Sequence, residues 1–201
     1  MRNKTIDYYN KHGLEYSSNT KSVEMTDHYS KFESMLNEGA VILDAGCGSG
    51  RDTKHFLETG FKVNAFDGSK AMSKFASEFT GIDVACASFT DYKYLENYYD
   101  GIWCCAALLH LSRKEIRKTI KSFYKALKND GIVYLSFKYG TGELTDANGR
   151  YFSLLNEDDF VLFTDGGLSI ENSYISNDNS GRDVKWMNLI LRKHSAGQNG
   201  V

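Results

Sequence analysis

The sequence predicts a single α/β domain: a mostly parallel sheet with helices on both of its faces. Short apolar runs alternate with segments of helical spacing along most of the 201 residues. A glycine-rich loop separates the first apolar run from the helical segment behind it. Near the C-terminus two apolar runs follow each other without a helical segment between them. Strands that alternate with helices favour parallel pairing, because the chain must cross back over the sheet between two parallel strands.

The individual elements follow from apolar spacing and from helix-capping residues. Ser69 stands at the N-cap of one predicted helix, and Ser112 with Glu115 has the form of a capping box at the start of another. The run Asn129-Asp-Gly131 is typical of a helix C-terminus. The predicted strands cover 41–43, 62–66, 84–87, 101–106, 131–137, 168–176 and 184–192. The predicted helices cover 52–58, 69–79, the segment from 112 to the Asn-Asp-Gly run, and 157–164, with a loop after 140.

We expect one folded domain over residues 39–193. Residues 1–38 precede the first strand and have helical character, so we expect them to form a lid over the rim of the sheet. Residues 194–201, His-Ser-Ala-Gly-Gln-Asn-Gly-Val, are expected to form a flexible tail.

Composition and charge disfavour several classes of partner. The formal net charge is -2, so the chain lacks the positive field that non-specific phosphate binding needs, and we do not expect a nucleic-acid partner. No apolar run approaches the roughly 18 residues of a membrane span, and the N-terminus has no apolar signal core, which favours a soluble, cytoplasmic protein. The cysteines at 47, 86, 104 and 105 match no metal-binding spacing. We therefore expect no metal, and we expect Cys104 and Cys105 to be ordinary strand residues.

The loop Asp44-Ala-Gly-Cys-Gly-Ser-Gly50 is the strongest functional signal. In an open parallel sheet, ligands bind beyond the carboxyl ends of the strands, where this first loop is expected to lie. Its glycines allow the backbone to approach a ligand and to adopt conformations that other residues resist. A dinucleotide fingerprint would place a third glycine where this chain has Arg51, so NAD, NADP and FAD are disfavoured. Asp67 ends the second predicted strand, where a carboxylate can accept hydrogen bonds from two ribose hydroxyls.

Three motifs in this order resemble the class I S-adenosylmethionine-dependent methyltransferases. They are Val41-Ile-Leu-Asp-Ala-Gly-Cys-Gly-Ser-Gly50, the acidic Asp67, and Asp100-Gly-Ile-Trp followed by Leu108-Leu-His-Leu111. A less specific similarity to small bacterial methyltransferases of the tellurite-resistance type continues through 138–140 and 148–152 to 186–189. The resemblance implies a Rossmann-like fold with seven strands, the last of them antiparallel. It also implies transfer of a methyl group from S-adenosylmethionine to a small-molecule acceptor.

The resemblance further implies which residues hold S-adenosylmethionine or its product, S-adenosylhomocysteine. The glycine loop would line the methionine part, Asp67 would meet the ribose, and Met72 would lie near the adenine. The family often has an acidic residue after the third strand, where this chain has Ser88, with Asp91 slightly beyond. Ala106 would border the transferred methyl group. The expected cofactor contacts are Tyr16 of the lid, Asp44, Ala45, Gly46, Gly48, Gly50, Asp67, Gly68, Met72, Ser88, Phe89 and Ala106.

The expected chemistry is the alignment of a nucleophile with a methyl group that the sulfonium already activates. A thiol acceptor needs no base, whereas a hydroxyl or an ammonium does, and His110 after the fourth strand is the candidate catalytic base. The chain contains no proline, so it lacks the Asn/Asp-Pro-Pro-aromatic loop with which family members methylate planar amino nitrogens. Cationic and aromatic residues expected near the substrate mouth, a mixture that suits an anionic or aromatic ligand, are Lys138, Tyr139, Arg150, Tyr151, Arg182 and Trp186.

Two other functions stay open at this point. One is a binding module that holds S-adenosylmethionine without turning it over, which Ser88 at the usual acidic position permits. The other is an NAD(P)-dependent oxidoreductase, which Arg51 disfavours.

Overall fold

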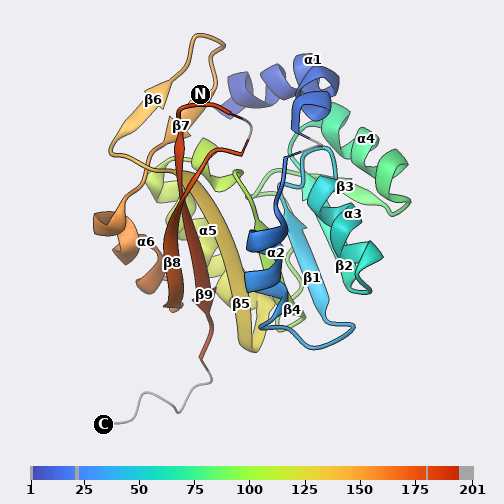
Figure 1. The fold of residues 1–201 in the computed structure, drawn as a ribbon, viewed down its shortest axis with the longest axis vertical. Helices are drawn as coiled ribbons and strands as arrows, with labels where there is room; N and C mark the ends of the chain where they lie inside the picture. Colours follow the sequence, from blue (N-terminus) through green and yellow to red (C-terminus); the bar gives the residue numbers. More distant parts are fainter. Residues whose placement is uncertain (1, 21–22, 180, 195–201) are drawn as a thin grey trace.

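The computed structural model describes residues 2–20, 23–179 and 181–194. A seven-stranded sheet with the order β3-β2-β1-β4-β5-β9-β8 runs through the molecule (Figure 1). Strands β1 to β5 are parallel, and β9 lies antiparallel between β5 and β8. The expected sheet, with its last strand antiparallel, is therefore confirmed. The strands are β1 (Val41–Ala45), β2 (Lys62–Asp67), β3 (Val84–Cys86), β4 (Tyr99–Cys104), β5 (Leu127–Lys138), β8 (Ser169–Asn177) and β9 (Lys185–Arg192).

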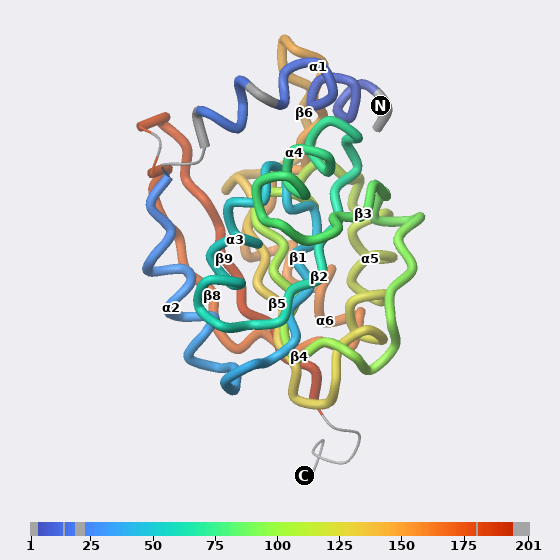
Figure 2. Tube along the Cα trace, turned by 90° about the vertical axis from the view of Figure 1, so that its right-hand side faces the viewer, coloured from blue at the N-terminus to red at the C-terminus, as the bar shows by residue number. Residues whose placement is uncertain are grey.

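Helices cover both faces of this sheet (Figure 2). On one face Phe32 of α2 and Phe56 of α3 pack against Trp103 of β4, and α4 continues this side through contacts of Ala76 with the edge strands. The other face is covered by α5 and α6. The helices are α1 (Arg2–Thr20), α2 (Thr26–Glu33), α3 (Arg51–Glu58), α4 (Lys70–Thr80), η1 (Leu108–His110), α5 (Arg113–Ala126), η2 (Glu157–Phe160) and α6 (Val161–Thr164). None of the helices in the described ranges is both long enough and apolar enough to cross a membrane.

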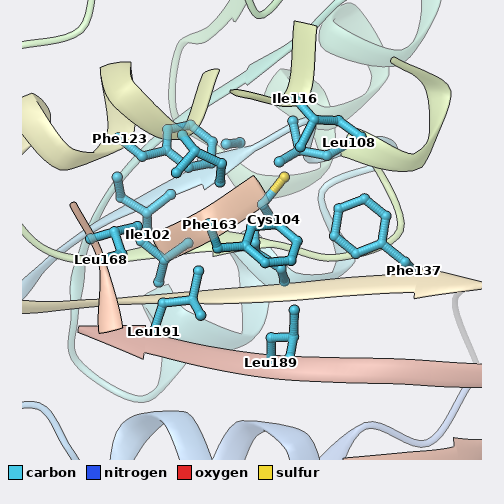
Figure 3. Packing of buried hydrophobic residues seen from close by; sticks show 14 of the residues in the cluster. Ile102, Cys104, Leu108, Ile116, Phe123, Phe137, Phe163, Leu168, Leu189 and Leu191 are labelled. Carbon is cyan, nitrogen blue, oxygen red and sulfur yellow. The ribbon is translucent and has the colours of Figure 1, made fainter. Parts of the chain in front are cut away.

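The central strand β4 is buried on both faces, as its apolar sequence predicts. Side chains alternate along a strand, so Ile102 and Cys104 face α5 while Trp103 faces α2 and α3. Figure 3 shows the first of these layers, in which Phe123 of α5 lies across from Leu191 of β9. All of these side chains are buried. Packing on both of its faces holds β4 in position. The loop that follows β4 is positioned by the same packing.

Both predicted helix caps are present. The Ser69 hydroxyl accepts a hydrogen bond from the Met72 amide at the start of α4. Ser112 and Glu115 form a complete capping box at the start of α5. Each cap satisfies amide groups that the first turn of a helix leaves without a partner, so both helices begin where the sequence predicts.

The expected helix end at Asn129-Asp-Gly131 is wrong. Helix α5 already ends at Ala126, and β5 begins at the next residue. The register between β4 and β5 shifts after the pair Tyr99 and Leu127, and Asp130 adopts a φ of 63°. An Asn-Asp-Gly run suits any backbone with positive φ, and here it forms a bulge within a strand rather than a helix end.

Two further expectations need correction. The segment after Gly140 is not only a loop, because β6 (Glu143–Thr145) and β7 (Tyr151–Ser153) pair as an antiparallel hairpin. Cys105 is not a strand residue, because β4 ends at Cys104.

Helix α1 and the β6–β7 hairpin lie at the same end of the sheet (Figure 1). Gly13 lies where α1 approaches α4, and a Cβ atom there would lie 2.7 Å from the Met72 sulfur, so that side chain would have to move. Of the expected tail, His194 still contacts the Ser169 hydroxyl at 2.6 Å, and 195–201 lie outside the described residues.

Candidate active site

A cavity lies at the carboxyl ends of β1, β2 and β4, beneath α1. Its walls come from the loops that follow these strands, from α1 and α2, and from the ends of β5, β8 and β9. A parallel sheet places ligands at this edge. Of the expected cofactor contacts, the cavity is lined by Tyr16, Gly46, Gly48, Asp67, Gly68, Met72, Ser88, Phe89 and Ala106.

The glycine loop follows β1 and has a different constraint at each glycine. Gly46 has a φ of 78°, and a Cβ atom there would lie 2.6 Å from the Ala107 Cβ. Gly48 has a φ of 56°, and an added Cβ would meet only the Met72 methyl, at 3.6 Å. A larger side chain at 48 would therefore extend into the cavity. Gly50 packs against α4 and does not line the cavity.

Asp67 joins the loops that follow β1 and β2. Its carboxylate accepts hydrogen bonds from the Gly48 amide at 2.9 Å and from the Ser69 amide at 2.7 Å. Burial raises the pKa of Asp67, although both amide hydrogen bonds act to lower it. A carboxylate has about four lone-pair positions, so each oxygen can accept a further hydrogen bond from the cavity side.

Asp44 and Ala45 are buried below the loop rather than exposed to the cavity. The Asp44 carboxylate accepts a hydrogen bond from the Thr53 hydroxyl at 2.5 Å, which joins β1 to α3. Burial and the nearby negative charge of Asp52 raise the pKa of Asp44. Asp44 therefore supports the loop from beneath.

A buried hydrogen-bond network at the start of α3 was not anticipated from the sequence. The Asp52 carboxylate accepts from Arg51 Nε at 2.6 Å, from the Tyr29 hydroxyl at 2.5 Å and from the indole of Trp103 at 2.8 Å. Burial acts to raise the pKa of Asp52, but the charge and hydrogen bonds of Arg51 outweigh it, and the pKa is lowered. Arg51 and Asp52 both line the cavity, so this network fixes one of its walls.

The expected adenine side contains Met72, Phe89 and Ser88. The Ser88 hydroxyl donates a hydrogen bond to the Asp91 carboxylate. The ring of Phe89 packs edge-on against Phe66, with 5.3 Å between ring centroids. A carboxylate is thus held next to the position where the family often has an acidic residue.

His110 lies in η1, between α1 and the β6–β7 hairpin. Its Nδ1 is 2.7 Å from the Tyr151 carbonyl oxygen, and its Nε2 is 3.0 Å from the Tyr9 hydroxyl. A carbonyl oxygen only accepts, so Nδ1 carries the proton and donates to it, and Nε2 accepts from Tyr9. Burial lowers the pKa of His110 to about 4, and the charges of Arg150 and Lys138 also act to lower it. The imidazole is neutral near pH 7, and its lone pair on Nε2 accepts the hydrogen bond of Tyr9 at the cavity wall.

The pKa of His110 predicts a loss of stability in acid. Folded His110 stays neutral down to a pH of about 4, while the unfolded chain takes up the proton near the usual value of 6.5. Protons therefore favour the unfolded state as the pH falls from 6.5 to 4, and the free energy of unfolding should drop by up to about 3 kcal/mol. Urea denaturation of wild type and His110→Gln over this range would measure it. Equal pH dependence in the two proteins would contradict the pKa of His110.

The tyrosines of α1 divide between the cavity and the outside. Tyr9 and Tyr16 both line the cavity and pack edge-to-face, with 5.2 Å between ring centroids. Burial raises the pKa of each. Tyr8 does not line the cavity; it stacks on His12 and lies below the Arg150 guanidinium.

The expected substrate residues do not form one wall. Trp186 lines the cavity and donates to the Asp178 carboxylate at 2.9 Å. Tyr139 is exposed, and its hydroxyl donates to Glu157. Tyr151 acts through its backbone, because its carbonyl oxygen accepts from His110. Lys138 and Arg150 do not line the cavity, and both are close enough to the buried Phe152 ring for cation–π contact.

Several polar residues of the cavity wall were missed by sequence reasoning. His28 of α2 is bonded through Nδ1 to the Tyr174 hydroxyl at 2.8 Å. Asn188 of β9 accepts from the Tyr134 hydroxyl at 2.7 Å. Burial raises the pKa of Cys105 to about 12, so its thiol stays protonated at neutral pH. These residues come from separate elements and share no motif, so no sequence signal groups them. The missed lining residues on this side are His28, Cys105, Ser136, Ser176 and Asn188.

Comparisons with known proteins match the segment of the chain that contains the glycine loop and Asp67. Residues 42–131 match a family model described as a methyltransferase domain. An uncharacterized methyltransferase of Oceanobacillus iheyensis is 30% identical over 110 residues, which are 53% of this chain and 52% of the relative. A glycine/sarcosine N-methyltransferase of Halorhodospira halochloris is 33% identical over 132 residues, which are 60% of this chain and 49% of the relative. The chain spans about half the length of the curated relatives that it matches.

The whole fold is similar to a crystal structure from Burkholderia thailandensis. That protein is 1,6-didemethyltoxoflavin-N1-methyltransferase with bound 1,6-didemethyltoxoflavin and S-adenosylhomocysteine. The TM-score is 0.79, the sequence identity is 19%, and the match covers 96% of this chain and 87% of that chain. This likeness shows that nearly all of the chain adopts the Rossmann-like methyltransferase fold.

Proposed function

Because this chain belongs to the class I S-adenosylmethionine-dependent methyltransferases, we propose that it transfers the methyl group of S-adenosylmethionine to a small-molecule acceptor. One observation carries the proposal: one cavity is lined by the glycine loop, by Asp67 and by the hydrogen-bonded pair of Tyr9 and His110. A binding site for the methyl donor and a candidate base for the acceptor thus share one enclosed space. Small-molecule acceptors are named for the related proteins of Halorhodospira halochloris and Burkholderia thailandensis, which supports this class.

The residues at the glycine loop suit an amino-acid-bearing nucleoside. Gly48 leaves open a space that a long side chain would occupy, so the methionine part can lie against the backbone. Asp67 retains acceptor capacity for the ribose hydroxyls, while its two amide hydrogen bonds keep the carboxylate in place. Met72 and Phe89 offer apolar surface for the adenine, and Ala106 leaves room beside the reacting centre.

The bound cofactor supplies a methyl group that its sulfonium activates, and the protein's own contribution is alignment and exclusion of water. Tyr9 and Tyr16 cover the cavity from α1, which keeps bulk water from the reacting centre. An oxygen or nitrogen acceptor would have to lose a proton when it is methylated, so the site needs a proton acceptor. The acceptor's proton passes to His110 Nε2. Tyr9 donates to this same atom, so the acceptor reaches His110 either in place of the Tyr9 hydroxyl or through it.

Binding of S-adenosylhomocysteine tests the cofactor half of the proposal. We expect a dissociation constant in the micromolar range by isothermal titration calorimetry. Asp67→Ala should weaken binding by about 1–3 kcal/mol. The substitution removes the acceptor for the ribose and the hydrogen bonds that connect the loops after β1 and β2. Asp67→Asn keeps one acceptor oxygen and should lose less. Unchanged affinity in Asp67→Ala would remove this residue from the cofactor site, and no binding by the wild type would overturn the function.

Turnover separates the enzyme from a silent binding module. S-adenosylmethionine labelled in its methyl group would be incubated with a panel of small hydroxyl, amine and thiol acceptors, and label would be followed into the acceptor. We expect transfer to at least one class, with His110→Gln retaining cofactor affinity but losing transfer to hydroxyl or amine acceptors. Binding without transfer across all classes would instead favour the silent module.

A further inference from the structure

Lys138 lies beside the wall of the cavity. Side chains two residues apart on a strand share a face, so Lys138 of β5 follows Tyr134 and Ser136, which both line the cavity. Its partner across β9 is Trp186, another lining residue. The Lys138 ammonium lies 3.8 Å from the centre of the Phe152 ring. Lys138 does not itself line the cavity, but it lies beside the part of the wall that Ser136 and Trp186 form.

Phe152 links this lysine to the candidate base. The rings of Phe152 and His110 are 4.8 Å apart, measured between centroids. Phe152 is buried and does not line the cavity, so it brings the Lys138 ammonium near His110 without offering a surface to a ligand. Trp186 and Tyr9 give aromatic surface to this part of the cavity wall, which suits an acceptor that contains an aromatic ring.

The charges around Lys138 do not balance. Arg150 is paired with Asp146 at 2.8 Å, and Arg182 is paired with Asp178 at 2.6 Å. Within residues 2–20, 23–179 and 181–194, Lys138 has no carboxylate at ion-pair distance. Burial and the positive charges of Arg150 and Arg182 lower the pKa of Lys138, although the charges of Asp146 and Asp178 act to raise it. The Lys138 ammonium is therefore partly buried without a direct ion pair, and a bound anion would stabilise it.

From this juxtaposition we propose that the acceptor carries a single carboxylate, which Lys138 binds at the cavity mouth while the acceptor's hydroxyl or amine faces His110. The inference rests on the proposed methyl transfer. A monoanion matches the one unpaired charge, because Asp146 and Asp178 already neutralise the two arginines. A phosphate monoester carries about -1.5 to -2 charges near neutral pH and would be less well balanced here.

The test uses the full chain loaded with S-adenosylhomocysteine, whose binding is measured first in the same sample. Salicylate and anthranilate are then titrated against their uncharged partners, salicylamide and anthranilamide, with phenyl phosphate as a third kind of probe. We expect the wild type to bind each carboxylate at least about tenfold more tightly than its amide. Phenyl phosphate should bind no better than the carboxylates.

Matched variants assign the preference to one side chain. Lys138→Met keeps the aliphatic contact with Phe152 and should reduce the carboxylate preference to within about twofold, with unchanged affinity for S-adenosylhomocysteine. Lys138→Arg should restore most of it. Lys121→Met, on the exposed surface of α5, is the control and should behave as wild type.

The possible results separate this inference from the function on which it rests. Equal or tighter binding of the amides, tighter binding of phenyl phosphate, or no binding of any probe up to about 10 mM would overturn the carboxylate assignment while the loaded cofactor site still supports methyl transfer. A preference that survives in Lys138→Met would overturn the role of Lys138. Failure of S-adenosylhomocysteine to bind would overturn the methyltransferase function itself.

Discussion

Gly48→Arg is expected to weaken binding of S-adenosylhomocysteine by at least about 100-fold, with little change in the fold. Gly48 lines the cavity, and a Cβ atom at this position would have only the Met72 methyl nearby, at 3.6 Å. The arginine side chain therefore has room to extend, and it extends into the space proposed for the methionine part of the cofactor. Calorimetric titration with S-adenosylhomocysteine measures the loss.

Gly48→Ala is the matched control for this prediction. Both variants place a Cβ atom on a residue with a φ of 56°, which costs about 1–2 kcal/mol of stability in either case. Only the arginine reaches far into the cavity, so alanine should keep affinity within about tenfold of the wild type. If the two variants bind S-adenosylhomocysteine equally well, the cofactor does not lie against this loop.

Gly46 would give a less informative experiment. An added Cβ there would collide with Ala107 at 2.6 Å and with the Phe89 ring at 3.1 Å. Substitution would therefore move the loop that follows β4 as well as block the ligand. Loss of binding could then be attributed to the fold, which is why Gly48 carries the test.

The sheet could be predicted from sequence because local signals repeat along it. Each parallel strand is a short apolar run next to a capped helix, and Ser69 and Ser112 mark two of these helix starts. The β6–β7 hairpin gave no such signal, because each of its strands has only three residues and Leu144 is the single apolar residue of β6. The bulge in β5 was also not predictable, since the run around Asp130 satisfies a helix end and a strand bulge equally well.

The residues of the candidate site can also be divided into those that the sequence predicts and those that it does not. Gly48 and Asp67 belong to contiguous motifs, and the sequence places them at the cavity. Asp44 belongs to the same motif but lies beneath the loop, and a motif does not distinguish a residue that lines a site from one that supports it. The contact of Tyr9 with His110 joins residues 101 positions apart, and that of His28 with Tyr174 joins residues 146 positions apart. Such pairs are brought together only by the packing of whole elements, which local patterns do not encode.

The network around Asp52 has the same origin, and it supports the prediction with the largest effect on stability. The Asp52 side chain is 9% exposed and accepts hydrogen bonds from Arg51, Tyr29 and Trp103. Asp52→Ala removes the acceptor that the three donors share. The largely buried Arg51 guanidinium, the Tyr29 hydroxyl and the Trp103 indole each lose this hydrogen bond. Breaking one side of a buried ion pair costs about 3–5 kcal/mol, and we expect a loss of this size in urea denaturation.

The double variant Arg51→Met/Asp52→Leu distinguishes the ion pair from simple loss of packing. It removes both charges and keeps similar volume, so it should recover a large part of the stability that Asp52→Ala loses, because no charge is then buried alone. The recovery should be incomplete, since the Tyr29 hydroxyl and the Trp103 indole lack their acceptor in both variants and destabilise both alike. Tyr29→Phe alone should cost only about 1 kcal/mol, because the remaining donors keep Asp52 satisfied. If the double variant is as unstable as Asp52→Ala, the charge of Arg51 is not what makes the loss large, and the wall of the cavity is held by packing alone.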